Sequence, residues 1–83
     1  MTASVIGELY AQVRAPQWAA ANLDGLADVL RDLSWLPPGP VRLRVPDLAT
    51  LDTDTQARLL RVLRVVADDT AGSARPVHVV RGG

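Results

Sequence analysis

Two short β-strand patterns, with a helical pattern between them, limit the folds open to this chain. Residues 41–45 read VRLRV between two prolines, and this alternation of apolar and charged residues predicts a strand with one covered face. Residues 77–80 form a β-branched run after a glycine and a proline, which predicts a second, buried strand. Two strands joined through a helix are most simply parallel, with a right-handed crossover between them. The sequence therefore predicts an α/β fold with a small parallel sheet of two strands.

Three or four helices are predicted to cover this sheet. Apolar residues recur at helical spacing in three segments, which are residues 4–14, 23–34 and 54–68. The predicted N-caps of these helices are Thr2 or Ser4, then Asn22, and last Thr53 with Gln56 as a capping box. The segment before the second helix carries Trp18 and is predicted to form a helical turn or a loop. At 83 residues the chain is expected to form a single domain over residues 1–83.

The composition leaves few groups for catalysis. The chain has no Cys, and its one His, His78, lies inside a predicted strand without nucleophiles or metal ligands clustered around it in the sequence. Nine basic residues balance nine acidic ones, so the net charge does not direct the molecule to nucleic acid or to anionic lipid. The sequence shows neither a signal peptide nor a membrane span. We therefore predict a cytoplasmic protein that is not an enzyme, has no cofactor or metal, and contacts neither nucleic acid nor membrane directly.

One feature of the second helix is not explained by helix stability. Asp24, Asp28 and Asp32 lie at i, i+4 and i+8, so they form an acidic ridge along the helix. Like charges at this spacing disfavour a helix by a few tenths of a kcal/mol per pair. The helix dipole offsets this cost for Asp24, and Arg31 offsets it for Asp32, whereas Asp28 has no cation at i−4 or i+4. The ridge is either a solvated helix face or a docking patch for a cationic partner.

The residues around the ridge favour a docking patch. Trp18 precedes the ridge, and small residues at 19–21 and at Gly25 flatten the surface beside it. Arginine side chains donate hydrogen bonds to a carboxylate as they do to a phosphate, so a row of carboxylates on a helix can imitate a nucleic-acid backbone. We therefore interpret the ridge as a mimic of RNA for a protein that binds RNA.

The same residues carry a family resemblance. The motif runs from Ala15-Pro16-Gln17-Trp18 to Asn22-Leu23-Asp24-Gly25-Leu26-Ala27-Asp28-Val29-Leu30, followed by Pro40-Val41-Arg42-Leu43, a helix and a terminal strand. Over residues 4–81 this sequence resembles the barstar-like inhibitors of guanyl-specific, barnase-type ribonucleases. The resemblance implies a barstar-like fold in which an aromatic residue, an Asn and two Asp plug the active site of the ribonuclease. These four family positions correspond to Trp18, Asn22, Asp24 and Asp28.

The chain departs from the family pattern at three places. The aromatic residue that the family places before the second Asp is Ala27 here. An acidic residue of the last helix falls at Val65, and Asp69, one turn later, is expected to take over its contact. Barstar-like proteins have a strand before the first helix, so the sheet is expected to lack that strand. The predicted partner-binding residues are Trp18, Asn22, Asp24, Gly25, Ala27, Asp28, Arg31, Asp32, Val65 and Asp69.

Three functions compete at this point. The first is a protein that is monomeric when free and forms a 1:1 complex with a secreted guanyl-specific ribonuclease, so that it protects the producing cell. The second is a structural module that assembles through an exposed sheet edge, with a merely solvated ridge. The third is an RNA-binding module that uses Arg58, Arg61 and Arg64, and the acidic ridge opposes it.

Overall fold

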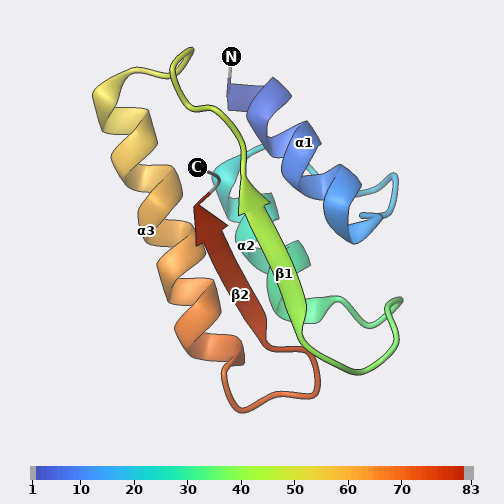
Figure 1. The fold of residues 1–83 in the computed structure, drawn as a ribbon. Helices are drawn as coiled ribbons and strands as arrows, with labels where there is room; N and C mark the ends of the chain where they lie inside the picture. Colours follow the sequence, from blue (N-terminus) through green and yellow to red (C-terminus); the bar gives the residue numbers. More distant parts are fainter. Residues whose placement is uncertain (1, 82–83) are drawn as a thin grey trace.

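The computed structural model describes residues 2–81 as an α/β fold with a two-stranded parallel sheet (Figure 1). The elements in chain order are α1 (Thr2–Val13), α2 (Leu23–Asp32), β1 (Val41–Val45), α3 (Thr53–Thr70) and β2 (Val77–Arg81). The strands pair from Val41 opposite Val77 to Val45 opposite Arg81. The predicted fold class and the parallel pairing are therefore confirmed, and each predicted helix and strand is present.

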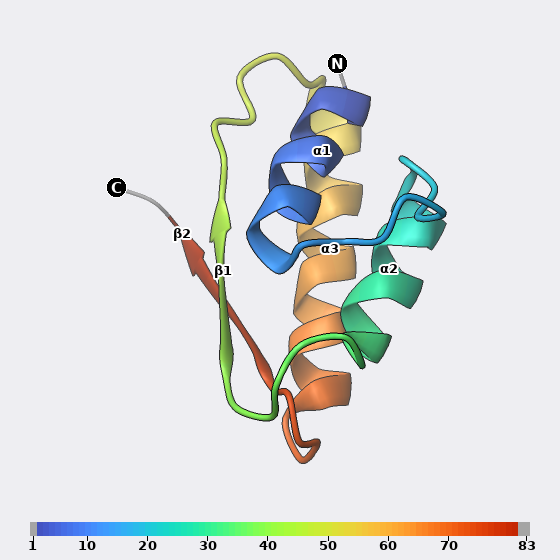
Figure 2. The same ribbon diagram turned by 90° about the vertical axis from the view of Figure 1, so that its right-hand side faces the viewer.

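The three helices lie on one side of the sheet. Figure 2 shows α1 and α3 next to the strands, and α2 on the far side of these two helices. The chain passes from β1 through α3 to β2 by the predicted right-handed crossover. The largest fully buried side chains are Ile6, Leu9, Val13, Leu26, Val29, Leu30, Leu33, Leu43, Leu59, Leu63 and Val66. The core thus forms between the helices and one face of the sheet.

The other face of the sheet is open to solvent, which corrects the prediction for the second strand. We predicted a buried strand at 77–80, but only Val77 is fully buried and His78 is exposed. The reason is that helices cover a single face, so alternate residues of both strands point to solvent. His78 therefore lies on the open face beside Arg42, its partner in the strand register.

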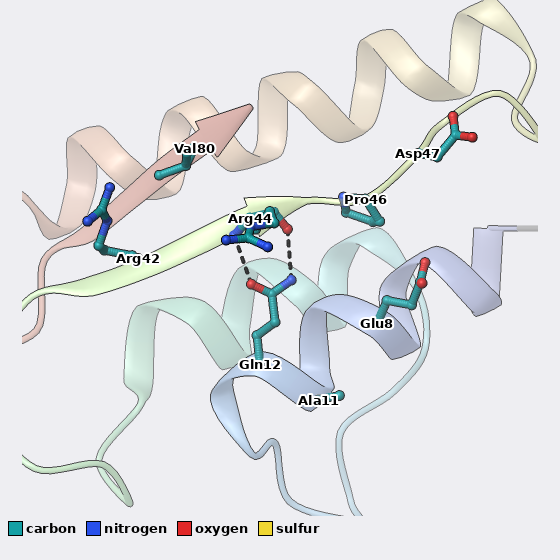
Figure 3. A pocket seen from close by; sticks show the side chains of 8 residues that line it. All are labelled: Glu8, Ala11, Gln12, Arg42, Arg44, Pro46, Asp47 and Val80. Atoms are coloured by element: carbon teal, nitrogen blue, oxygen red, sulfur yellow. Dashed lines mark hydrogen bonds between the residues drawn. The ribbon is translucent and has the colours of Figure 1, made fainter. Parts of the chain in front are cut away.

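Side chains partly close the outer edges of both strands, and Figure 3 shows the contact on β1. The Val41 N–H donates to the Pro76 carbonyl, so the backbone groups of Arg44 point to the free side of β1. There the Gln12 side chain accepts from the Arg44 N–H at 2.8 Å and donates to its carbonyl at 2.7 Å. On β2, the Val77 N–H donates to the Thr70 hydroxyl at 2.9 Å. Side chains that occupy edge groups in this way oppose strand addition, so the structure does not favour assembly through the sheet edge.

The starts of two helices differ from the predictions. Helix α1 begins at Thr2 and includes Ser4, so neither residue stands before the helix as a cap. The N-cap of α3 is Asp52, whose carboxylate accepts from the Thr55 N–H at 2.6 Å. This carboxylate contact lowers the pKa of Asp52. The Gln56 side chain donates instead to the carbonyls of the preceding loop at Leu48 and Leu51, so the predicted capping box is wrong.

Helix α1 ends in a Schellman motif that contains a strained residue. The Ala15 N–H donates to the Tyr10 carbonyl at 3.0 Å, and the Arg14 N–H donates to the Ala11 carbonyl at 3.5 Å. Arg14 has a φ of 53°, in the left-handed region where a side chain is unfavourable. Its side chain is exposed and makes no ion pair among the described residues.

We expect Arg14→Gly to stabilise the protein by about 1 kcal/mol, because glycine adopts a positive φ without steric cost. Thermal unfolding followed by circular dichroism measures this change. Arg14→Ala is the matched control, since it removes the same charge but keeps the Cβ. An equal gain from both variants would show that the charge, and not the backbone conformation, limits stability.

Candidate functional site

Helix α2 separates an apolar side from an acidic side. Leu26, Val29 and Leu30 are buried, while the three ridge residues Asp24, Asp28 and Asp32 are all exposed. The helix starts at Asn22 as predicted, because the Asn22 side chain accepts from the Gly25 N–H at 2.7 Å. Helix α2 lies on the far side of α1 and α3 from the sheet (Figure 2). Its apolar side is buried in the core, so the exposed ridge lies on the outer surface of the helix.

Asp28 carries a free negative charge at the middle of the ridge. It forms no ion pair or hydrogen bond within residues 2–81. The pKa of Tyr10 in α1 is raised, first by burial of the phenol and second by the negative charge of Asp28. Within the described residues, no cation forms an ion pair with Asp28.

Arg31 links α2 to α3, and this differs from its predicted contact. We expected Arg31 to offset the charge of Asp32, but its guanidinium lies 3.1 Å from the Asp69 carboxylate of α3. Both side chains are about half exposed, at 47% and 49%. The ion pair places Asp69 beside the last turn of α2, next to the end of the ridge, and gives Asp69 a cationic partner.

The neighbouring face of α3 contributes apolar and basic groups. Val65 is 40% exposed. A shallow depression at the start of α2 is lined by Asn22 and Asp24 together with Arg58 and Arg61. Arg58 is paired with Asp54 at 3.1 Å, one turn earlier on α3. The face made by α2 and α3 is thus acidic along α2 and bordered by arginines on α3.

Trp18 is the most exposed large apolar side chain in the described chain, at 68%. It lies in residues 14–22, which we call the Trp18 loop. Its ring meets the ring of Trp35 edge to face, with 6.3 Å between the centroids and 89° between the planes. The Trp35 indole N–H donates to the Val13 carbonyl at 2.8 Å, so Trp35 is fixed to the end of α1. One edge of Trp18 is thereby supported while most of the ring remains open to a partner.

The Trp18 loop also contacts α1 and α2 at its other end. The Tyr10 hydroxyl donates to the Ala20 carbonyl at 2.6 Å. A Cβ on Gly25 would lie 2.5 Å from the same carbonyl oxygen, so only glycine allows the loop to pass this close to α2. Ala27 is half-buried and packs against the core, so it adds little to the exposed face. Tyr10 and Trp35 therefore support the site, although the sequence pattern assigned neither of them to it.

The site offers negative charge and an exposed aromatic surface. Among residues 2–81, no cluster of His, Asp and Glu is able to hold a metal ion. His78 lies on β2 and is exposed on the face of the sheet that the helices leave open. No helix in the described part of the chain is both long and apolar enough to span a bilayer. The arrangement of α2 and the Trp18 loop is suited to bind a cationic surface with a place for an indole ring.

A comparison with protein families finds a match over almost the whole chain. The family model described as Barstar (barnase inhibitor) matches residues 2–81. This range includes the whole ridge, the Trp18 loop and both strands. No curated protein and no solved structure matched the chain.

Proposed function

Because this chain belongs to the barstar family of barnase inhibitors, we propose that it inhibits a guanyl-specific ribonuclease by covering the active site with α2 and the Trp18 loop. The observation that carries the proposal is the unneutralised carboxylate of Asp28 between two further exposed carboxylates. A ribonuclease that binds RNA presents cationic side chains to the phosphates. These side chains also donate charge-assisted hydrogen bonds to carboxylates.

The structure supports a division of roles on this face. The ridge supplies negative charge for association, which electrostatic attraction accelerates. Trp18 supplies a large aromatic surface, and such residues are frequent anchors in protein interfaces. The edge contact with Trp35 orients the indole before binding, which lowers the entropy lost on association. The partner that fits is therefore a basic cleft with an adjacent apolar recess.

Asp69 has a more restricted role in this proposal than Asp28. The sequence suggested that Asp69 replaces the acidic contact absent at Val65. In the free protein Asp69 is bound to Arg31, so it contacts a cation of the ribonuclease only by sharing or releasing Arg31. We therefore propose that Asp28, and not Asp69, is the main acidic contact, and that the Arg31–Asp69 pair borders the interface.

The remaining parts of the proposal concern the setting of the inhibitor. We propose that it acts in the cytoplasm of a cell that exports the ribonuclease, as a monomer that forms a 1:1 complex. Members of this family are inhibitors, and we propose that this chain likewise has no catalytic activity of its own.

Titration of a guanyl-specific ribonuclease with the purified protein tests the proposal. We expect loss of RNA cleavage at a 1:1 ratio, and an association rate that falls as salt increases, because screening weakens the attraction between the ridge and the enzyme. The matched control is the double variant Asp24→Asn/Asp28→Asn, which keeps side-chain shape but removes two charges. Full inhibition by this variant, with an unchanged salt dependence, would refute the assignment of the ridge.

A further inference from the structure

The Trp18 loop carries an interface residue but has no regular secondary structure, so specific contacts must define its position. From those contacts we infer that Tyr10 is a positioning residue, which holds the loop against α1 and α2 and so fixes Trp18 relative to Asp28. The inference rests on the proposed function for its effect on ribonuclease binding, whereas the effect on the loop itself is independent of any partner.

The Ala20 carbonyl group of the loop is confined between two helices. The Ala20 carbonyl accepts the Tyr10 hydroxyl at 2.6 Å from the side of α1. From the side of α2, Gly25 approaches so closely that a Cβ would lie 2.5 Å from the same oxygen. The loop is therefore held between two helices at Ala20, two residues after Trp18.

Tyr10 is itself held by its side chain and by its backbone. Its side chain is half-buried and packs against the hydrophobic core. Its own carbonyl accepts the Ala15 N–H in the Schellman motif, so the backbone of Tyr10 also defines where the loop begins. Because Tyr10 is held in this way, its hydroxyl fixes the position of the Ala20 carbonyl in the loop.

Different residues hold the two ends of the loop. Trp35 bonds to the Val13 carbonyl and contacts the Trp18 ring, so it acts at the end near α1. Tyr10 acts at the end near α2, the helix that carries Asp28, through its hydrogen bond to the Ala20 carbonyl. Loss of the Tyr10 contact therefore frees the part of the loop that sets the position of Trp18 relative to the ridge.

Tyr10→Phe is the main test, because it removes the hydroxyl and keeps the buried ring. We expect the variant to fold, with loop residues 17–21 showing lower ¹⁵N heteronuclear NOE values and faster amide exchange than in the parent protein. We expect the affinity for the guanyl-specific ribonuclease to fall about 5- to 10-fold, as for the loss of one hydrogen bond. Gln17→Ala is the control, since Gln17 lies in the same loop, is exposed and makes no side-chain hydrogen bond within residues 2–81.

Gly25→Ala provides a second variant that moves the loop from the opposite side, because the added Cβ must displace the Ala20 carbonyl. We expect it to change the amide shifts of residues 18–21 and to weaken ribonuclease binding, although Tyr10 is intact. Since Tyr10 is the only Tyr in the chain, absorbance during alkaline titration also reports its pKa directly. Asp28→Asn is expected to lower that pKa, because the charge of Asp28 raises it.

The outcomes separate the inference from the proposed function. An unchanged loop NOE profile and unchanged affinity in Tyr10→Phe would overturn the positioning role. If the loop becomes mobile in Tyr10→Phe while the parent protein itself fails to bind any guanyl-specific ribonuclease, the positioning role stands and the proposed function fails. Weaker binding by Gln17→Ala of the same size as by Tyr10→Phe would also contradict a specific role for Tyr10.

Discussion

Asp28→Ala is expected to weaken binding to the ribonuclease by at least about 30-fold without lowering the unfolding temperature. Within residues 2–81 of the free protein, the Asp28 carboxylate has no ion-pair or hydrogen-bond partner, and it lies one turn from two like charges. Its removal relieves repulsion of a few tenths of a kcal/mol and introduces a better helix former. Isothermal titration calorimetry and thermal unfolding measure the two effects on the same sample.

The large effect on binding follows from desolvation in the complex. A cation of the ribonuclease that faces Asp28 loses water on association, and alanine leaves that cation buried without a partner. Removing one member of such a pair costs about 2–5 kcal/mol. The opposite signs of the effects on binding and on stability distinguish an interface residue from a structural one.

Asp32→Ala is the control for Asp28→Ala. Asp32 belongs to the same ridge but lies at the end of α2, in the last residue of the helix. We expect a smaller loss of affinity from Asp32→Ala. Unfolding of Asp28→Ala would instead identify the ridge as structural, and equal affinities of Asp28→Ala and the parent protein would remove α2 from the interface.

The strands and their pairing were predictable from the sequence because local signals agreed. The two prolines that flank VRLRV limit the first strand to the residues observed, Val41–Val45. The prediction that the second strand is buried was wrong. The β-branched run at 77–80 does not reveal that helices cover only one face of the sheet. Burial on the second face depends on what packs there, and no local pattern contains that information.

The helix starts show how tertiary contacts replace local motifs. Thr53 and Gln56 match a capping box, yet Asp52 caps α3 because its carboxylate reaches the Thr55 N–H. Gln56 then donates to two carbonyls in the loop after β1, at Leu48 and Leu51. A glutamine that can satisfy two buried loop carbonyls stabilises the fold more than it would as a cap.

The candidate site was predictable only for residues that share one helix. The spacing along α2 predicted the exposure of the ridge, and the structure agrees. Tyr10, Trp35 and the Arg31–Asp69 pair were not predictable, because their partners lie 10, 22 and 38 residues away. Contacts at such separations depend on helix packing, whereas sequence periodicity reports only which face of each helix is apolar.

Trp18→Ala is expected to weaken ribonuclease binding by about 30-fold, which corresponds to the cost of about 2 kcal/mol that marks an interface anchor. The side chain is 68% exposed, so most of its surface is available to a partner and little of it supports the fold. The contact with Trp35 adds at most about 0.5–1.5 kcal/mol to stability. Surface plasmon resonance should show the loss as faster dissociation, because short-range contacts act after the charged surfaces meet.

Trp18→Phe is the matched variant, because it keeps an aromatic ring at the edge of Trp35 and removes the indole N–H. We expect it to retain most of the affinity if the ring fills an apolar recess of the ribonuclease. A loss as large as that of Trp18→Ala would mean that the indole N–H makes a hydrogen bond in the complex. If Trp18→Ala instead dissociates as slowly as the parent protein, the loop does not enter the interface, and α2 alone makes the contact.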